Sequence, residues 1–477
     1  MKNKFLKKVI FTLFVAALFI FSVSASPGNY EKSFEIYDEP DLDPLVDLEV
    51  TVEIQAIRSL QKFDIPNPKT LERIDWLGDP DFFVKVYIND QEFVSDTWHN
   101  TKYIYNPGFS PTLDVRDDEE FVEIKIQLYD WNSYGSRLCD LSANGKDVEL
   151  TYSLKTGHWT GDDRISDSSG YGRLNGCADG SIYKRQKDCE LWFNIYQNDY
   201  DGDGIPYWTE TNVYGTDPTV DNTGEDADDD NVPIEWEWKW DYDPFKKENH
   251  YLLDPEGDGV DNLEEYYVSQ WGSDPYREDI FIELDYMEES PDGIGNTLSE
   301  GAVELLSTAF NRFDMVFHID KGQMGGGGEI IPFDDYMGRH DLDDIYWEYF
   351  LHEDEYNWRK SVFRYSVIVY DPGRAGYNFR RGAFVLGSNI IVNERIMLDI
   401  PRIVDVGWAG VYMHEMGHTF ALNNPGVDNP NIWQYLNYKS CMKYLYTYIL
   451  VDYSDGSRIN DFNDWEDMDL QHFQREW

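Results

Sequence analysis

Between residues 46 and 197 the chain contains several short segments in which hydrophobic and polar residues alternate. In "EFVEIKIQLYDWN", Ile124, Ile126 and Leu128 fall on one face, and charged or polar residues stand between them. A period of two is typical of a strand with one buried face. Further segments of this kind, separated by turn-rich loops, are "LEVTVEIQAIR", "DFFVKVYIND", "QEFVSDTW" and "CELWFNIYQND". The pattern predicts an all-β antiparallel sandwich.

From residue 276 to residue 477 the hydrophobic pattern changes. Buried strands are predicted in "DIFIELDYM", "MVFHID", "SVFRYSVIVYD" and "GAFVLGSNIIVN", and helical spacing occurs in "LSEGAVELLSTAFNR" and "RIVDVGWAGVYMHEMGHTFAL". The alternation predicts an α/β (α+β) domain with a twisted mixed sheet. We expect the strand that ends in "GSNIIVN" to be an edge strand, able to pair with an extended peptide. The glycine run from Gly325 to Gly328 predicts a flexible surface loop, because no phosphate-loop lysine follows it.

Residues 1–25 have the pattern of a secretory signal peptide. Lysines precede an apolar run from Val9 to Phe21, and small residues lead to a cleavage site after Ala25. Residues 26–45 are polar and predict a linker. The apolar run is shorter than a membrane span, which needs about 20 residues, and no later stretch is longer. We therefore expect a secreted, extracellular, multidomain protein with no integral membrane span.

The formal net charge of −51 narrows the choice of partners. It argues against nucleic acid or anionic lipid as a direct electrostatic partner, and it favours multivalent cations. Aromatic residues make up 16 % of the chain, so the charge does not indicate disorder. Three of the four cysteines, Cys139, Cys177 and Cys189, fall in one region. In an exported protein we expect one disulfide among them, with the pairing left open.

Three acidic loops between residues 198 and 275 share the spacing of an EF-hand-like calcium loop. In "DYDGDGIPYWTE" oxygen donors occupy positions 1, 3, 5 and 12, glycine permits the turn at position 6, and position 7 offers its backbone carbonyl. The predicted ligands are Asp199, Asp201, Asp203, Ile205 and Glu210; then Asp226, Asp228, Asp230, Val232 and Glu237; then Asp254, Glu256, Asp258, Val260 and Glu265. A solvated acidic linker does not explain an apolar residue at position 7 in every loop. We expect about three calcium ions, which stiffen these repeats into a spacer.

Two resemblances extend this interpretation. "YGTDPTVDN" and "WGSDPYRED" are similar to the spacers of bacterial thrombospondin type 3 and dockerin-like calcium repeats. The sandwich segment resembles a C2 domain, through "DPDFFVKVYIND", "TKYIYNPGFSPTLD" and "FVEIKIQLYDWN" in that family's order. The resemblance implies further calcium ligands at the loop tips, and calcium-dependent contact with a surface or lipid. The matching positions are Asp79, Asp81, Asp130, Asn132 and Asp140. A generic sandwich would leave these carboxylates merely solvated.

The segment "HEMGH" has the spacing of a zinc site on a helix. His414 and His418 are four residues apart, so both imidazoles reach one ion from the same face. Glu415 is placed to act as general base toward the attacking water of a peptide hydrolysis, and then to return the proton to the leaving nitrogen. The alternative without a metal is a buried helix that happens to carry two histidines. The apolar flanks "WAGVYM" and "TFAL" count against it, because unliganded paired histidines are costly there.

Together with "SCMKY" downstream, this segment resembles the metzincin metallopeptidases. Met442 matches their Met-turn methionine, and Ser440 and Tyr444 complete the S-x-M-x-Y form of the astacin branch, in which the tyrosine approaches the zinc. The resemblance implies one catalytic zinc and a protein or peptide substrate. Two positions depart from the pattern: Ala421 stands where glycine is expected, and Asn424 stands where the third ligand is expected.

The two departures leave the third zinc ligand open. Alanine takes a left-handed turn less cheaply than glycine, and an amide is a poor zinc ligand. We therefore expect the helix to continue, and the chain to return so that Asp428 supplies the third ligand, as in some bacterial members of the group. An acid within "DYSDGSRINDFNDWEDMD" is the alternative; otherwise that stretch is a solvated tail or a further calcium site.

The sequence thus favours a secreted, calcium-stabilised zinc metalloendopeptidase. A competing hypothesis is a calcium-dependent extracellular adhesion or matrix-binding protein whose peptidase domain is degenerate. An active hydrolase with a non-peptide substrate is a third. Metal stoichiometry and the effect of replacing Glu415 separate the first two hypotheses, and only an activity assay separates the third.

Overall fold

The computed structural model describes residues 47–60, 79–132, 135–143, 145–162, 172–179, 187–395, 401–423, 437–458 and 461–475. The predicted signal peptide and linker lie outside the described residues. None of the described helices is long and apolar enough to cross a membrane.

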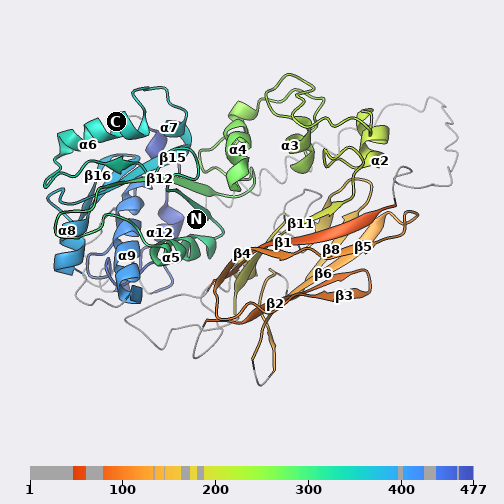
Figure 1. Ribbon diagram of the computed structural model, residues 1–477, viewed down its shortest axis with the longest axis horizontal. Coiled ribbons are helices and arrows are strands. Elements are labelled where there is room, and N and C mark those ends of the chain that lie inside the picture. The colour runs from red at the N-terminus through yellow and green to blue at the C-terminus, as the bar shows by residue number, and fades with distance from the viewer. Residues whose placement is uncertain are drawn as a thin grey trace. The chain divides into compact units, whose positions relative to one another are not determined.

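Two antiparallel sheets form the N-terminal sandwich (Figure 1). One has the order β10-β11-β1-β4 with β5 beside β1, and the other has the order β3-β2-β6-β8-β9 with β7 beside β6. Their strands are β1 (Glu49–Ser59), β2 (Phe82–Ile88), β3 (Gln91–Val94), β4 (Tyr103–Phe109), β5 (Thr112–Asp114), β6 (Phe121–Asp130), β7 (Arg137–Leu138), β8 (Val148–Ser153), β9 (Trp159–Gly161), β10 (Arg173–Asn175) and β11 (Cys189–Gln197).

The alternation in the sequence explains this architecture. In β6 the buried and exposed positions alternate along the strand, and Ile124, Ile126 and Leu128 enter a core shared with Val52 of β1 and Val84 of β2. Hydrophobic faces of two sheets thus close on one another, as an amphipathic sheet requires. The predicted β-sandwich is confirmed.

The acidic segment contains only short helices, which alternate with the loops: α2 (Tyr207–Thr209), α3 (Ile234–Lys239) and α4 (Asn262–Val268). It has a small core of its own, in which Val232, Trp236 and Trp240 are buried. Val232 occupies position 7 of the second loop, and Ile205 and Val260 at the same position of the other loops are also buried. The apolar residue at position 7 is therefore what anchors each loop to the protein.

A six-stranded mixed sheet organises the C-terminal domain. Its order is β13-β12-β15-β17-β16, with β14 beside β12. All neighbours in it are parallel except β16, which runs antiparallel to β17 at the edge. The elements are β12 (Asp279–Met287), α5 (Glu300–Asn311), β13 (Val316–Asp320), β14 (Ile330–Ile331), α6 (Arg339–Ile345), α7 (Arg359–Val362), β15 (Phe363–Val369), β16 (Gly376–Arg380), β17 (Ala383–Gly387), α8 (Ser388–Ile390), α9 (Pro401–Thr419) and α12 (Asp464–Asp467).

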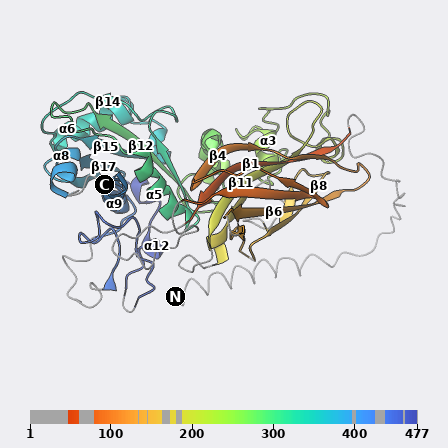
Figure 2. The ribbon, with the colours of Figure 1, turned by 60° about the horizontal axis from the view of Figure 1, so that its bottom comes forward.

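The two faces of this sheet have separate cores. Leu306 of α5 and Met413 of α9 pack with Ile280 and Ile282 on one face. Leu342 of α6 packs with Phe281 on the other face. Figures 1 and 2 show α5 and α9 on the same side of the sheet. Sheet and helices thus form the expected α/β arrangement, with α9 held against the sheet beside its antiparallel edge.

The prediction that the strand ending in "GSNIIVN" lies at the edge of the sheet is wrong. In the segment "GAFVLGSNIIVN", β17 ends at Gly387, and helical turns begin at Ser388. β17 lies between β15 and β16, so the edge belongs to β16, a strand that the sequence analysis missed. The residues of β16 are only partly buried except for Phe379, and such a strand lacks the continuous apolar run that identified the others.

The expected disulfide is also absent: all four cysteines are buried as thiols. The thiols of Cys139 and Cys189 lie within hydrogen-bonding distance of each other, and burial raises the pKa of Cys189 well above its ordinary value. Cys139 and Cys189 both belong to the sandwich core, where they act as small apolar side chains.

The glycine run is packed rather than free. A Cβ added at Gly326 would lie 2.4 Å from Oε2 of Glu283, and one at Gly327 would lie 2.2 Å from the carbonyl oxygen of Asp320. The Gly326 amide donates to Oδ2 of Asp320 at 3.0 Å. The glycines are present because the chain closes over a buried cluster in which Arg359 pairs with Glu283 and Asp320.

Candidate metal centre

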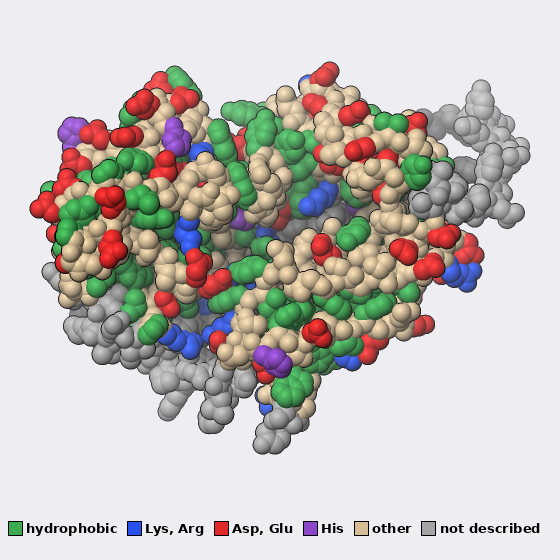
Figure 3. All heavy atoms as spheres, in the orientation of Figure 1, with side chains coloured by type: hydrophobic (Ala, Val, Ile, Leu, Met, Phe, Trp, Pro, Cys, Tyr) green, Lys and Arg blue, Asp and Glu red, His purple; other side chains and the backbone are tan. Residues whose placement is uncertain are grey.

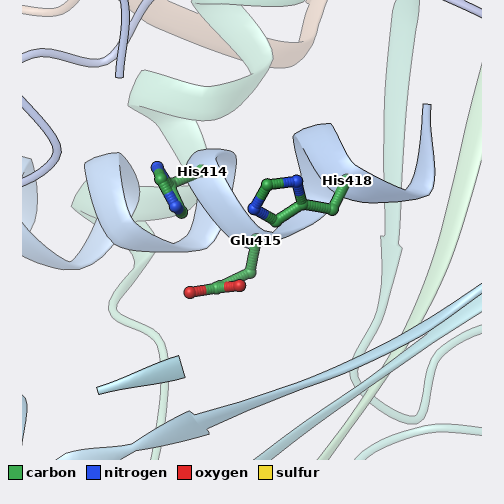
Figure 4. A group of neighbouring side chains, drawn as sticks. All are labelled: His414, Glu415 and His418. Carbon is green, nitrogen blue, oxygen red and sulfur yellow. The ribbon is translucent and has the colours of Figure 1, made fainter. Parts of the chain in front are cut away.

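Helix α9 carries three side chains with metal-binding chemistry on one face. The ligand atoms of His414, Glu415 and His418 all lie within 4.8 Å of one another. Figure 4 shows the two imidazole rings beside the Glu415 carboxylate, which extends from the helix toward the strands. The surrounding helix is apolar and buried, from Val406 to Met416. The three polar groups therefore share one small region of an otherwise hydrophobic surface.

Hydrogen bonds fix the tautomer of both histidines. Nδ1 of His414 lies 2.8 Å from the Cys441 carbonyl oxygen, and Nδ1 of His418 lies 2.7 Å from that of Leu422. A carbonyl oxygen only accepts, so each Nδ1 donates its proton and each Nε2 keeps a lone pair. Burial lowers the pKa of His414 to about 4 and also lowers that of His418. Both rings are therefore neutral at pH 7, the form that binds a metal.

Glu415 lies against the antiparallel edge strand. A Cβ added at Gly376, the first residue of β16, would lie 2.6 Å from its Oε1. The missing side chain at Gly376 thus makes room for the carboxylate. Burial raises the pKa of Glu415 to about 8, although the charge of Arg374 opposes the rise.

The downstream turn brings Met442 and Tyr444 to the same site. A Cβ added at Gly417 would lie 2.5 Å from Sδ of Met442, so this buried methionine packs directly against α9 at Gly417. The Met442 amide donates to Oγ of Ser440 at 3.1 Å. The ring of Tyr444 is exposed and its centroid lies 5.4 Å from that of His414. Met442 therefore forms a floor, and Tyr444 stands at the rim.

Our expectation that the helix continues past His418 is wrong. α9 ends at Thr419, and Ala421 adopts a left-handed conformation with φ of 63°. The Leu422 amide donates to the Gly417 carbonyl at 3.0 Å, and the Ala421 amide to that of His418 at 3.3 Å, which together form a Schellman cap. Burial of Phe420 and Leu422 holds this turn closed despite the strain on alanine. The cap also brings the Leu422 carbonyl to His418.

The third ligand is not among the described residues. The described His, Cys, Asp and Glu residues add no further member to the group of His414, Glu415 and His418. In the late acidic stretch, both carboxylate oxygens of Asp464 accept from the Tyr438 hydroxyl, and Asp461 accepts from Ser454. Asp452 is buried, 3.5 Å from Arg312. These acids therefore serve the local fold, and Asp428 lies outside the described residues.

The three acidic loops have the same backbone geometry. The residue at position 6 is left-handed in each, with φ of 90° at Gly204, 79° at Asn231 and 100° at Gly259. The carboxylate at position 1 accepts from the amide of that residue at 2.9 Å, 2.8 Å and 3.2 Å respectively. Three acidic groups that could hold a metal ion result: Asp199, Asp201, Asp203 and Glu210; Asp226, Asp228 and Asp230; and Asp254, Glu256 and Asp258.

Several carboxylates in these loops lack hydrogen-bond partners in the described chain. Buried oxygens without a hydrogen-bond partner occur in Asp201, Glu210, Asp228, Glu237, Glu256 and Glu265. Burial, together with the neighbouring carboxylates, raises the pKa of Glu210 to about 8 and that of Glu256 to about 11. A bound divalent cation is the partner that this donor set fits.

Two residues near the loops were missed. His250 follows the second loop, and its Nε2 lies 3.2 Å from Oδ2 of Asp230. Asp279, at the start of β12, donates its amide to Oδ2 of Asp258 at 2.6 Å and pairs with His318 at 2.7 Å. Each lies well outside a twelve-residue loop, so ligand spacing gives no signal for it.

No protein-family model and no curated protein matches the chain. Among solved structures, one described as a C2 domain is 10 % identical, covers 31 % of this chain and 97 % of its own, and has a TM-score of 0.19. A C2 domain of plant extended synaptotagmin 1 is 16 % identical, with coverage of 31 % and 96 % and a TM-score of 0.17. The calcium-bound pair of C2 domains of extended-synaptotagmin 2 is 14 % identical, with coverage of 32 % and 46 % and a TM-score of 0.19.

The sandwich is similar to C2 domains. At these TM-scores the likeness says nothing about what it binds, which has to be argued from the residues. Asp79 lies 3.3 Å from Nζ of Lys102, and Asp81 lies 3.2 Å from Nδ1 of His99. Asp130 accepts from the side-chain amide of Asn132 at 2.9 Å and lies 3.7 Å from Nζ of Lys187, while Asp140 is buried.

The loop-tip calcium site stays a prediction. Among the described residues, Asp79, Asp81, Asp130 and Asp140 are not in any of the His, Cys, Asp and Glu groups that could hold a metal ion. Lys102, His99 and Lys187 are the basic neighbours of Asp79, Asp81 and Asp130 respectively.

Proposed function

We propose that the protein is a secreted, calcium-stabilised zinc endopeptidase. The observation that carries the proposal is the pair of neutral imidazoles on α9: each Nδ1 donates to a carbonyl, and neither Nε2 is hydrogen-bonded within the described part of the chain, while Glu415 lies close to both rings. A structural histidine pair in an apolar helix would be expected to use both ring nitrogens. The two open Nε2 atoms instead fit one metal ion.

In this mechanism each side chain has a distinct task. His414 and His418 hold the ion, and the carbonyls of Cys441 and Leu422 orient their rings. Zinc, when bound, supplies Lewis acidity: it lowers the pKa of water to about 7 and polarises a carbonyl. Glu415 accepts the proton of the attacking water and returns it to the leaving amine.

The position of Glu415 also suggests how substrate is held. It lies against Gly376 at the start of the edge strand β16. An extended peptide that pairs with an edge strand gains backbone hydrogen bonds in a fixed register. A peptide on β16 would pass directly over the carboxylate, and this supports a peptide rather than another substrate class.

Asp428, which lies outside the described residues, remains our candidate for the third zinc ligand. The chain leaves the site at the cap beyond His418, and the described acids downstream serve other contacts. Calcium in the loops at residues 198–275 completes the cofactor set, because their buried carboxylates need a cation.

A second candidate is the calcium-dependent extracellular binding protein with a degenerate peptidase domain. It is favoured by the separate β-sandwich, which the proposed chemistry does not use, and by acidic loops that do not need catalysis to explain them. The two candidates differ in what they require of Glu415.

The proposal is tested by replacing Glu415 with its amide. We expect Glu415→Gln to lower kcat for an unfolded casein substrate by about 10²-fold or more, while about one zinc per chain is retained at the α9 site. His418→Ala should lose both that zinc and the activity. Metal analysis after dialysis against calcium, beside the proteolysis assay, provides both readouts. Unaltered activity in Glu415→Gln, or no zinc lost in His418→Ala, would rule out the peptidase.

A further inference from the structure

The second acidic loop differs from the first in how its last glutamate is used. In the first loop Glu210 gathers with the carboxylates at positions 1, 3 and 5. In the second loop the corresponding Glu237 gathers instead with Asp230 and His250, so two groups share Asp230. His250 comes from beyond α3, the helix that carries Glu237 (Figure 1). A nitrogen donor thus enters a loop whose sequence predicts oxygen donors alone.

The three side chains are wholly enclosed. Asp230, Glu237 and His250 have no exposed side-chain surface, and their ligand atoms lie within 4.8 Å of one another. Within the described residues, neither Nε2 of His250 nor either oxygen of Glu237 has a hydrogen-bond partner, and Nε2 lies 3.5 Å from Oε1 of Glu237. Burial alone would lower the pKa of His250, but the two acids outweigh it and raise the pKa. Polar atoms buried in this way cost free energy unless something binds them.

The distances suit a small transition-metal ion. Nε2 of His250 lies 3.2 Å from Oδ2 of Asp230 and 3.5 Å from Oε1 of Glu237. Two ligand atoms bound at about 2.0–2.1 Å in tetrahedral geometry lie about 3.3 Å apart. The two separations that involve His250 therefore already match a coordination shell.

The second ring nitrogen of His250 has its own neighbour. Nδ1 lies 3.3 Å from the side-chain amide of Asn262, whose Oδ1 is buried without a partner. When this amide is turned so that Oδ1 accepts the Nδ1 proton, the unpaired oxygen is satisfied. Nε2 then keeps a lone pair directed at the two carboxylates, which is the arrangement of a ligating histidine with an outer hydrogen bond.

We propose that Asp230, Glu237 and His250 form a second transition-metal site, for a divalent ion of the zinc class. Calcium binds oxygen donors, whereas imidazole together with carboxylate suits zinc. Among the described residues no histidine joins the metal-binding groups of the first and third loops, which keep the oxygen donors of calcium sites. The site is independent of the α9 centre and of catalysis.

The test counts zinc with the α9 centre removed. The full chain is dialysed against excess calcium with trace zinc, and zinc is measured for wild type, His418→Ala, His250→Gln and the double variant. We expect about two, one, one and no zinc ions per chain respectively. His340→Gln, which alters an exposed imidazole, is the matched control and should retain the wild-type count.

A thermal measurement decides the case if His250→Gln does not fold. Zinc added in the presence of saturating calcium should raise the Tm of His418→Ala, because this variant keeps only the proposed site. The proposal is overturned by an unchanged Tm, or by equal zinc counts with and without His250; His250 would then be an internal cation paired with the two acids. Zinc lost in His250→Gln but not in His418→Ala would contradict the peptidase and leave this site standing.

Discussion

Ala421 illustrates at the scale of one residue how burial outweighs backbone preference. A left-handed alanine costs about 1 kcal/mol relative to glycine. Burial of the neighbours Phe420 and Leu422 offsets this cost, and it also places the Leu422 carbonyl beside His418. Local preference alone led us to extend the helix, since it gives no weight to tertiary contacts beyond the cap.

We predict that Ala421→Gly stabilises the fold by about 1 kcal/mol, because glycine adopts φ near 63° without strain. The measurement is the urea midpoint of the full chain in calcium. Ala409→Gly, in the middle of α9, is the control and should destabilise by about 1 kcal/mol. Equal shifts in the two variants would contradict a strained cap.

A second residue-scale prediction concerns Gly376. Gly376→Ala would bring a Cβ to 2.6 Å from Oε1 of Glu415 and force the carboxylate to move. Because a displacement of about 1 Å can cost on the order of 10²-fold in rate, we expect kcat to fall by that order while zinc content is kept. Gly295→Ala is the control, since an added Cβ there meets nothing within 4 Å. An unaltered kcat would show that Glu415 does not work at the edge strand.

At the scale of elements, the acidic loops were predictable and the sheet edge was not. Loop spacing is a local property, because one short segment supplies the donors and the turn. The position of a strand in a sheet depends on partners distant in sequence, so β16 escaped notice and β17 was misplaced. The same reason hid His250 and Asp279, which reach the loops from other segments.

The raised pKa values in the loops predict an unusual pH dependence for the calcium-free protein. Burial raises the pKa of Glu210 from its ordinary 4.5 to about 8, and that of Glu237 to about 7. The folded state therefore binds more protons than the unfolded state. The contribution of these two groups to the free energy of unfolding is fully present below about pH 4.5 and is lost as pH rises through about 8. Proteolysis of residues 198–275 in chelator should be faster at pH 8 than at pH 5, and added calcium should remove the difference. Faster cleavage at the lower pH would contradict this account.

At the scale of the whole molecule, the surface is strongly acidic while the described domains meet through buried charge. Figure 3 shows Asp and Glu side chains spread over the visible face, with few Lys and Arg. Inside, Glu190 of β11 contacts Arg173 of β10 and accepts from the side chain of Asn311 in α5. Burial alone would raise the pKa of Glu190, but Arg173, Arg277 and Arg58 outweigh it and lower the pKa.

We predict that Glu190→Gln destabilises the protein by about 3 kcal/mol, because it removes a buried counter-charge that Arg173, Arg277 and Arg58 share. Since Glu190 touches both the sandwich and α5, tryptophan fluorescence and far-UV circular dichroism should shift together in thermal unfolding. Glu49→Gln, at the exposed end of β1, is the control and should change little. A wild-type Tm in Glu190→Gln would contradict a shared buried charge cluster.

The sequence by itself determined the features that depend only on residues close together along the chain. These are the alternation that makes the sandwich, the apolar runs of the parallel strands, the spacing of the loops and the two histidines one turn apart on α9. Only the tertiary structure decided which strand forms the edge, where α9 ends, and that His414 turns one nitrogen to the Cys441 carbonyl while the cap brings the Leu422 carbonyl to His418. It also decided that the basic side chains Lys102 and Lys187 stand beside the sandwich acids. The physical reason is the same in each case: spacing along the chain fixes which face a side chain takes, whereas burial and hydrogen-bond partners depend on residues that only folding brings near.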